Sequence, residues 1–217
     1  MPHYKLTYFC VRGKGEFIRQ LFALAGVEFE DDRFSLGPTG RGEGIAQTNW
    51  AEVKKTTPYG QLPVLDVDGK QLGEANAIAK YVAAEYGFNG ANAWEAAQID
   101  SVGIHYDDLF KACVPFYLSW HRISKQTMED AYKSSVEAGR DAFFQPICKL
   151  LRENKSGFII GDKVTWVDLL VADHCETFTK YNENYLEKYP EAKAHMEKIH
   201  SIPAIRKWIE TRPETEI

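Results

Sequence analysis

The strongest constraint on this fold is a change of pattern after residue 86. Before that point, short strand-like runs alternate with helix-like runs, and beyond residue 92 only long helical patterns follow. Strands interleaved with helices build a sheet with helices packed on it, whereas uninterrupted helical patterns build a bundle. The sequence therefore predicts an α/β domain over residues 1–86, a linker over 87–92 and an all-helical domain over 93–217.

The elements expected in the first domain follow the order β-α-β and then β-β-α. Strand composition is found at Tyr4–Phe9, and apolar residues recur at helical spacing over Glu16–Ala25. The remaining expectations are a strand over Val27–Phe34, a hairpin turning at Asp68-Gly69 between Leu62–Val67 and Gln71-Leu72, and a helix over Ala77–Tyr86. This order is typical of a thioredoxin-like domain. Such a domain offers a site at the carboxyl end of its first strand, where the next helix N-terminus favours an anion.

Helical patterns in the second part cover residues 93–120, 127–154, 166–180, 189–200 and 203–210. Pro190 and Pro203 suit the first turns of their helices. Thr165 and Asp168 have the spacing of a capping box before an apolar run. We interpret that pair as the start of a helix rather than as catalytic residues.

Four glycines and one proline between Leu36 and Gln47 predict a flexible loop. The loop lacks the Walker spacing and its Lys-Ser/Thr pair, so a phosphate-binding loop is not indicated.

Composition narrows the class of protein. The net charge of −5 argues against a general nucleic-acid binder, and no apolar run approaches the roughly 18–20 residues of a membrane span. No secretory apolar region follows the N-terminal Met-Pro-His-Tyr-Lys. The spacings of Cys10, Cys113, Cys148 and Cys175 fit neither a zinc site nor a disulfide framework. We expect a cytoplasmic protein without a metal, a nucleic-acid partner or a membrane anchor.

Five motifs stand at the spacing of one family. They are Tyr4-Lys-Leu-Thr-Tyr8-Phe9 with Arg12-Gly13 and Glu16; Trp50 with Lys54; Pro58-Tyr-Gly-Gln-Leu-Pro-Val-Leu65; Glu74-Ala75-Asn76-Ala77-Ile78; and Gly161-Asp-Lys-Val-Thr-Trp-Val-Asp168. Together they resemble the sigma-class glutathione S-transferases, which include glutathione-dependent prostaglandin D synthase and many nematode enzymes. The resemblance covers nearly the whole chain. It implies a homodimer that uses glutathione as co-substrate.

The resemblance implies that Tyr8 is the catalytic residue. Glutathione is a tripeptide thiol, and a free thiol with a pKa of about 8.5 is little ionised at neutral pH. A tyrosine hydroxyl that donates a hydrogen bond to the sulfur favours the thiolate, which is the nucleophilic form. Without the motif, Tyr8 would read as a core aromatic of an alternating strand.

The resemblance also implies a set of residues that hold glutathione. Lys54 would face the glycine carboxylate beside Trp50, and a cis Leu62-Pro63 bond would turn the backbone of Leu62 toward the cysteinyl part. Lys14 stands where many relatives carry arginine near the sulfur, and a solvated lysine at a helix start is an equal alternative. The full set is Tyr8, Phe9, Lys14, Trp50, Lys54, Gln61, Leu62, Pro63, Glu74, Ala75 and Asp108.

Two departures from the family pattern stand out. Ala75 replaces the serine or threonine that follows Glu74 in relatives, so a hydroxyl at the γ-glutamyl carboxylate is lost while the backbone N–H of Ala75 remains. The loss of one such bond is worth roughly 0.5–1.5 kcal/mol, which weakens binding without abolishing it. The stretch between Arg33 and Trp50 is also roughly ten residues longer than in sigma relatives, a length that a surface loop tolerates.

Asp108 matches an aspartate that, in relatives, reaches across the dimer to the γ-glutamyl amine. The plainer alternative is that Asp107 and Asp108 form a solvated acidic face of the helix. The electrophile pocket should be apolar and lie between the domains. The resemblance assigns to it Val11, Gly13, Phe110 and Phe116. We interpret the neighbouring Tyr106, Tyr117 and Trp120 as core residues.

The sequence predicts a transferase that conjugates the glutathione thiolate to small hydrophobic electrophiles. It leaves open peroxidase or isomerase activity, including prostaglandin isomerisation, because these reactions use the same thiolate. A non-catalytic ligand-binding or structural member of the same fold is a further alternative. Thiol-transferase chemistry through Cys10 is disfavoured, because Gly13 stands where a Cys-x-x-Cys partner would be. The physiological electrophile is not determined by the sequence.

Overall fold

The computed structural model describes residues 2–34 and 50–215, with side chains described for 2–34 and 52–215. The glycine-rich loop predicted over 36–47 lies outside this part. Contacts divide the chain into two compact units. The N-terminal unit comprises Met1–Gly87 and Ser201–Ile217, and the helical unit comprises Phe88–His200.

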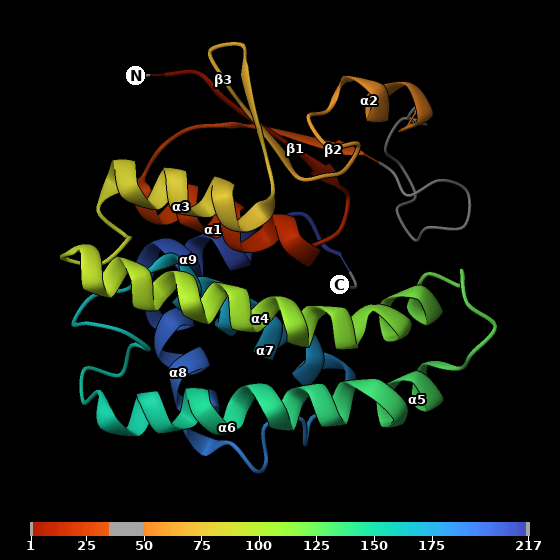
Figure 1. The fold of residues 1–217 in the computed structure, drawn as a ribbon, viewed down its shortest axis with the longest axis vertical. Coiled ribbons are helices and arrows are strands. Elements are labelled where there is room, and N and C mark those ends of the chain that lie inside the picture. The colour runs from red at the N-terminus through yellow and green to blue at the C-terminus, as the bar shows by residue number, and fades with distance from the viewer. Residues whose placement is uncertain (1, 35–49, 216–217) are drawn as a thin grey trace. The chain divides into compact units, whose positions relative to one another are not determined.

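The sheet of the N-terminal unit has four strands in the order β2-β1-β3-β4, of which β1, β2 and β3 are labelled in Figure 1. The strands are β1 (Tyr4–Phe9), β2 (Glu30–Phe34), β3 (Val64–Val67) and β4 (Lys70–Gly73). Strand β1 runs parallel to β2 and antiparallel to β3, and β3 and β4 form the predicted hairpin around Asp68 and Gly69. The predicted thioredoxin-like order of strands and helices is confirmed.

Helices α1 (Gly13–Ala25) and α3 (Ala75–Tyr86) lie beside each other on one face of this sheet (Figure 1), and α2 (Trp50–Thr56) lies between β2 and β3 in sequence. Burial alternates along β1, so Tyr4, Leu6 and Tyr8 share its buried face. Helix α1 supplies the facing apolar side chains of Phe17, Ile18, Leu21 and Phe22, which are almost fully buried. The core of the unit therefore reaches the carboxyl end of β1.

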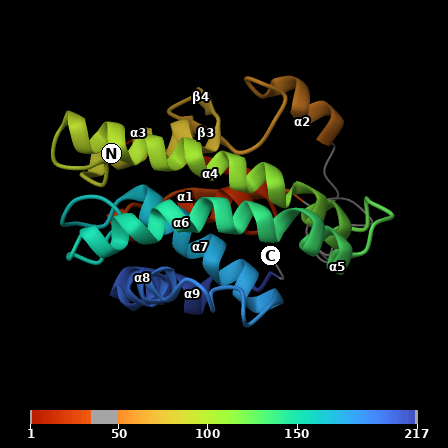
Figure 2. The ribbon, with the colours of Figure 1, turned by 60° about the horizontal axis from the view of Figure 1, so that its bottom comes forward.

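The helical unit contains α4 (Ala93–Trp120), α5 (Met128–Ala131), a π-helical turn η1 (Tyr132–Val136), α6 (Glu137–Glu153), α7 (Trp166–Tyr181) and α8 (Pro190–Ser201), most of them visible in Figure 2. Helices α4 and α6 pack against each other, and α7 packs on α4. The helix expected over 127–154 is divided by η1. The helices predicted over 93–120, 166–180 and 189–200 agree with α4, α7 and α8 to within one residue at each end.

Asp168 in the first turn of α7 makes several hydrogen bonds that stabilise the start of this helix. Its Oδ2 accepts hydrogen bonds of 2.8 Å from both the backbone N–H and the hydroxyl of Thr165. Its Oδ1 accepts from the backbone N–H of Ile159 at 2.9 Å and lies 2.9 Å from Nε2 of His195. The interpretation of Thr165 and Asp168 as a capping box is confirmed.

Helix α9 (Pro203–Thr211) packs on α1 of the N-terminal unit. Its position in the sequence placed it in the expected helical domain over 93–217. That domain boundary stays a prediction, and the contacts within the structure group Ser201–Ile217 with Met1–Gly87. The physical reason is that Trp208 and Arg212 bind Glu16 of α1, as described below.

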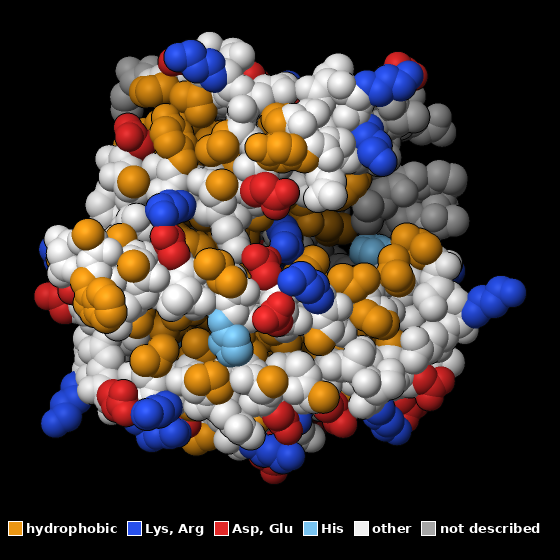
Figure 3. Space-filling model, in the orientation of Figure 1, with side chains coloured by type: hydrophobic (Ala, Val, Ile, Leu, Met, Phe, Trp, Pro, Cys, Tyr) orange, Lys and Arg blue, Asp and Glu red, His pale blue; other side chains and the backbone are white. Residues whose placement is uncertain are grey.

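Acidic and basic side chains are interspersed over the face drawn in Figure 3. Among the helices that the structure describes, none combines the length and the apolar composition that a membrane span requires. Within the same residues, no group of three or more His, Cys, Asp or Glu side chains is placed to hold a metal ion.

Candidate active site

The strand register brings several predicted site segments to one edge of the sheet. Phe9 at the end of β1 pairs with Phe34 at the end of β2, and Thr7 pairs with Val64 at the start of β3. Val64 also pairs with Gly73 at the end of β4. The segments that adjoin these strand ends are Tyr8-Phe9, Leu62-Pro63 and Glu74-Ala75. The sheet thus gathers the segments predicted to hold the sulfur, the cysteinyl part and the γ-glutamyl part of glutathione.

Tyr8 lies at the carboxyl end of β1 with its hydroxyl at the first turn of α1. The side chain is 8% exposed, so most of the ring is core. The hydroxyl oxygen accepts a hydrogen bond of 3.0 Å from the backbone N–H of Lys14. The ring of Tyr8 therefore belongs to the core, as the plainer interpretation expects, and its hydroxyl lies at a helix N-terminus, where negative charge is stabilised. The catalytic role of Tyr8 stays a prediction.

Two glycines allow the first turn of α1 to approach the Tyr8 ring closely. Gly13 has φ of +40°, and a Cβ there would lie 2.7 Å from the Tyr8 hydroxyl oxygen. A Cβ on Gly15 would lie 2.5 Å from the ring of Tyr8. Gly13 was predicted to line the electrophile pocket; in the structure it lies against the Tyr8 side chain, and its place in a pocket stays a prediction.

The Leu62-Pro63 peptide bond is cis, as the resemblance implied. Pro63 is buried and leads directly into β3, whereas Leu62 is half-buried. The bond lies one residue before Val64, which pairs with Thr7 of the tyrosine-bearing strand. The backbone of Leu62 is therefore next to the carboxyl end of β1.

Glu74 adopts an unusual backbone conformation at the start of α3. Its φ is +70°, a value that residues with a side chain rarely adopt and that clusters at functional sites. The Glu74 side chain is exposed, and Ala75 behind it is 4% exposed at the first position of the helix. The exposed carboxylate and the N-terminal backbone of α3 are the groups offered to a ligand at this end.

Helix α2 carries Trp50 and Lys54, but the Trp50 side chain lies outside the described part of the chain. Lys54 is exposed, and its aliphatic stem lies over Gly60, where a Cβ would come within 3.2 Å of it. Gln61, next to Gly60, is also exposed. The roles of these residues stay predictions.

The remaining predicted site residues include members of the helical unit. Asp108 is 74% exposed on α4, and its carboxylate pairs with Lys111 at 3.2 Å. Phe110 is half-buried, whereas Phe116 is fully buried, with its ring 4.7 Å from that of Tyr181 and 5.3 Å from that of Phe178. This packing favours a core role for Phe116. The pocket assigned to Val11, Gly13, Phe110 and Phe116 draws on both units and stays a prediction.

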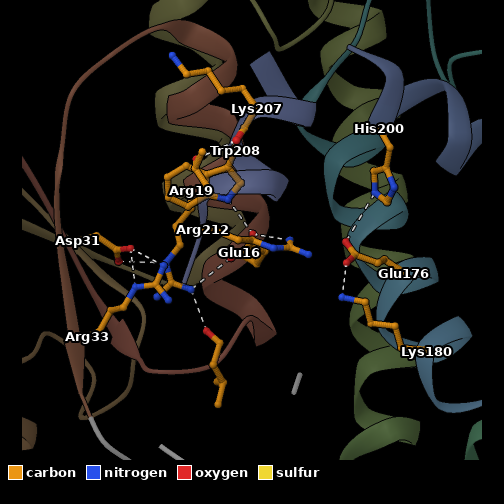
Figure 4. Close-up of polar contacts among 12 residues, drawn as sticks. Glu16, Arg19, Asp31, Arg33, Glu176, Lys180, His200, Lys207, Trp208 and Arg212 are labelled. Carbon is orange, nitrogen blue, oxygen red and sulfur yellow. Dashed lines mark hydrogen bonds and ion pairs between the residues drawn. The ribbon is translucent and has the colours of Figure 1, made fainter. Parts of the chain in front are cut away.

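A buried charge network behind Tyr8 was not predicted. Glu16 and Arg19 of α1 are 1% and 0% exposed, and they join residues of β2 and of the C-terminal segment (Figure 4). The i, i+3 spacing of Glu16 and Arg19 could have indicated an ion pair. Nothing local in the sequence indicated that the pair would be buried, because its other partners lie far along the chain.

The comparisons with known proteins agree with this geometry. The chain matches the glutathione S-transferase N-terminal domain over residues 4–84 and the glutathione S-transferase C-terminal domain over residues 108–212. It is 40% identical over 216 residues to probable glutathione S-transferase 8 of Caenorhabditis elegans, with 100% of both chains covered. A thioredoxin-like domain followed by a helical domain is the architecture of this class. The chain belongs to the glutathione S-transferase family.

Two solved structures extend the comparison. A glutathione S-transferase of the hookworm Necator americanus, described as monomeric, is 41% identical with a TM-score of 0.90, and the match covers 99% of this chain and 100% of that one. Prostaglandin synthase D of Nilaparvata lugens is 30% identical with a TM-score of 0.82, and the match again covers 99% of this chain and 100% of that one.

Proposed function

We propose that the chain conjugates the glutathione thiolate to small hydrophobic electrophiles, with Tyr8 as the catalytic residue. The observation that carries the proposal is the placement of the Tyr8 hydroxyl. It lies at the N-terminus of α1, accepts the Lys14 N–H at 3.0 Å, and belongs to the sheet edge where the site segments gather. Membership in the glutathione S-transferase family supports the same activity.

The chemistry requires the thiol of glutathione to lose its proton to solvent or base. The Tyr8 O–H then donates a hydrogen bond to the resulting thiolate, which favours ionisation and keeps the sulfur in place. The sulfur forms its new bond to the electrophilic carbon, and the leaving group departs with the electron pair of the broken bond. The N-terminus of α1 adds a positive potential on the side where the sulfur carries its charge.

The exposed and backbone groups at the sheet edge suit the rest of the tripeptide. In this proposal Lys54 of α2 pairs with the glycine carboxylate, and the backbone of Leu62 bonds the cysteinyl amide. In the same proposal the Glu74 carboxylate pairs with the γ-glutamyl amine, and the N–H of Ala75 donates to the γ-glutamyl carboxylate. No metal takes part in this mechanism.

The assembly we propose is a homodimer in the cytoplasm. The exposed carboxylate of Asp108 is available to reach the γ-glutamyl amine of glutathione bound to a second subunit. The four cysteines are free thiols, which suits a reducing compartment. Because one hookworm relative is described as monomeric, the dimer is tested separately below.

A glutathione-dependent prostaglandin isomerase is the second candidate. Its support is the 30% identity to prostaglandin synthase D of Nilaparvata lugens over nearly the whole chain. Isomerisation uses the same thiolate, so Tyr8 serves both reactions. An isomerase would turn over a prostaglandin endoperoxide faster than simple aromatic halides.

The test compares the wild-type protein and the Tyr8→Phe variant in two measurements: binding to a glutathione-affinity resin and a conjugation assay with chlorodinitrobenzene. Both proteins should bind the resin, and turnover should fall by about 100-fold in the variant, the effect of one lost charge-stabilising donor. Wild-type turnover in Tyr8→Phe would remove this residue from the mechanism. Binding without turnover by the wild-type protein, toward halides, peroxides and endoperoxides alike, would favour a non-catalytic binding protein.

A further inference from the structure

Arg19 of α1 holds the loop that follows the tyrosine strand. Its Nη1 donates a 2.8 Å hydrogen bond to the carbonyl of Val11, and its Nη2 donates one of 3.3 Å to the carbonyl of Phe9. The guanidinium carbon also lies 5.8 Å from the centre of the Tyr8 ring. Arg19 therefore contacts both the catalytic side chain and the backbone immediately after it.

Two carboxylates hold this arginine, which is fully buried. Nε of Arg19 pairs with Oδ1 of Asp31 on β2 at 3.0 Å, and Nη1 lies 3.5 Å from Oε2 of Glu16. Asp31 is itself bound by Arg33 at 2.6 Å, also on β2. Figure 4 shows Arg19 reaching toward both carboxylates from α1. A planar guanidinium with five donors can satisfy two carboxylates and two carbonyls at once, which a lysine cannot.

The C-terminal segment completes the network at Glu16. Oε1 of Glu16 accepts hydrogen bonds of 2.8 Å from Nε1 of Trp208 in α9 and of 2.8 Å from Nη1 of Arg212, the residue after α9. Burial would raise the pKa of Glu16, but the charges of Arg212 and Arg19 and the Trp208 bond outweigh it and lower the pKa. Glu16 is therefore an anion at neutral pH, which is the form that can hold Arg19.

We propose that Arg19 is a positioning residue for Tyr8, and that Glu16 with Trp208 and Arg212 holds Arg19 in place. A hydrogen-bond donor stabilises a developing charge only when it is fixed at the correct distance, and small displacements are costly. On this view the end of the chain, about 200 residues from Tyr8 in sequence, helps to set the thiolate-stabilising geometry. The inference rests on the proposed role of Tyr8.

The plainer alternative is that Glu16, Trp208 and Arg212 only attach α9 to the N-terminal unit. Both views expect a lower melting temperature when the network is broken. They differ in the pKa of the bound glutathione thiol, because loss of attachment alone leaves the sulfur environment unchanged. The ultraviolet absorbance of the thiolate, titrated with glutathione bound, measures that pKa directly.

The experiment uses the full chain with Arg212→Met, Trp208→Phe and Arg212→Lys. In Arg212→Met the pKa of the bound thiol should rise by about one unit, so turnover near neutral pH falls about tenfold and recovers as the pH is raised. Trp208→Phe keeps the ring beside Phe29 and removes only the N–H, so a smaller shift in the same direction is expected. Arg212→Lys keeps the charge and should restore most of the wild-type pKa.

Arg206→Met is the matched control, because Arg206 is exposed on the same helix and its loss should leave the thiol pKa unchanged. An unchanged thiol pKa in folded Arg212→Met and Trp208→Phe would overturn the inference, and Trp208→Phe alone decides if Arg212→Met does not fold. Tyr8→Phe separates the two proposals. If it raises the thiol pKa and the network variants do not, only this inference fails. If it leaves the thiol pKa unchanged, the proposed role of Tyr8 fails as well.

Discussion

The backbone N–H of Lys14 donates a 3.0 Å hydrogen bond to the hydroxyl oxygen of Tyr8. This contact joins the end of β1 to the first turn of α1 through the atom that we assign to catalysis. An oxygen that accepts one hydrogen bond becomes a stronger donor in the next, because such bonds polarise one another. The backbone N–H of Lys14 therefore favours a hydrogen bond from the Tyr8 hydroxyl to a thiolate, independently of the Lys14 side chain.

Gly13→Ala should damage this contact. The new Cβ would lie 2.7 Å from the Tyr8 hydroxyl oxygen, which must shift, and we expect turnover to fall by about tenfold or more. Gly69→Ala is the control, since φ is +84° there and, among the described residues other than its chain neighbours, none comes within 4 Å of the added Cβ. Both variants should lose roughly 1 kcal/mol of stability from backbone strain, but only Gly13→Ala should lose activity. Equal turnover in the two variants would contradict the prediction that activity depends on the close contact between Gly13 and the Tyr8 hydroxyl.

Ala75→Ser should tighten glutathione binding. The residue occupies the first position of α3, where a hydroxyl can donate to the γ-glutamyl carboxylate beside the backbone N–H. One good hydrogen bond to a charged group corresponds to a gain in affinity of up to about tenfold. Calorimetry with glutathione measures the gain. No gain, or a loss, would mean that the backbone already satisfies that carboxylate.

Asp108→Asn tests the shared site. If the carboxylate binds the γ-glutamyl amine of the other subunit's glutathione, the variant should bind glutathione about tenfold more weakly and keep its turnover at saturation. Lys111→Met is the control, because it removes the present partner of Asp108 at 3.2 Å and leaves the carboxylate in place. An unchanged dissociation constant for glutathione in Asp108→Asn would mean that this residue is only part of a solvated acidic face.

The same idea requires a two-fold dimer, in which one surface serves both partners. Light scattering at micromolar concentration measures the mass directly. A stable monomer with full activity would exclude a site shared between subunits, independently of the result for Asp108→Asn.

His174 predicts a pH dependence of stability. Its ring nitrogens lie 3.2 Å from the Tyr106 hydroxyl and 2.7 Å from the Tyr185 hydroxyl, and burial lowers its pKa from 6.5 to about 3. Between pH 6.5 and pH 3 the unfolded chain binds a proton at this histidine and the folded chain does not. The contribution of His174 to the free energy of unfolding is therefore fully present above pH 6.5 and is lost as the pH falls toward 3. The loss by pH 5 should be about 2 kcal/mol.

Urea unfolding at pH 7 and pH 5 measures this loss. His174→Gln keeps hydrogen-bonding atoms for both tyrosines and cannot titrate. From pH 7 to pH 5 its free energy of unfolding should therefore decrease by about 2 kcal/mol less than that of the wild-type protein. His3→Gln is the control, because His3 is 69% exposed and its substitution should leave the wild-type slope. The same slope in His174→Gln and the wild-type protein would contradict the prediction.

Local pattern was enough to predict much of the fold. Strand composition predicted β1 at Tyr4–Phe9, and the spacing of Thr165 and Asp168 predicted the start of α7. These features depend on residues a few positions apart, so periodicity and capping rules reach them. The π-helical turn at Tyr132–Val136 was missed, because its pattern of apolar residues continues that of the flanking helices.

The sequence by itself determined the order of strands and helices, the family and the candidate residue Tyr8. Only the tertiary structure decided that Glu16 and Arg19 are buried, that α9 belongs with α1, and that Glu74 has φ of +70°. A charged side chain is buried only where opposite charges and hydrogen bonds compensate its lost hydration. For Glu16 that compensation comes from Trp208 and Arg212, which lie at the far end of the chain and reach it only when the chain is folded.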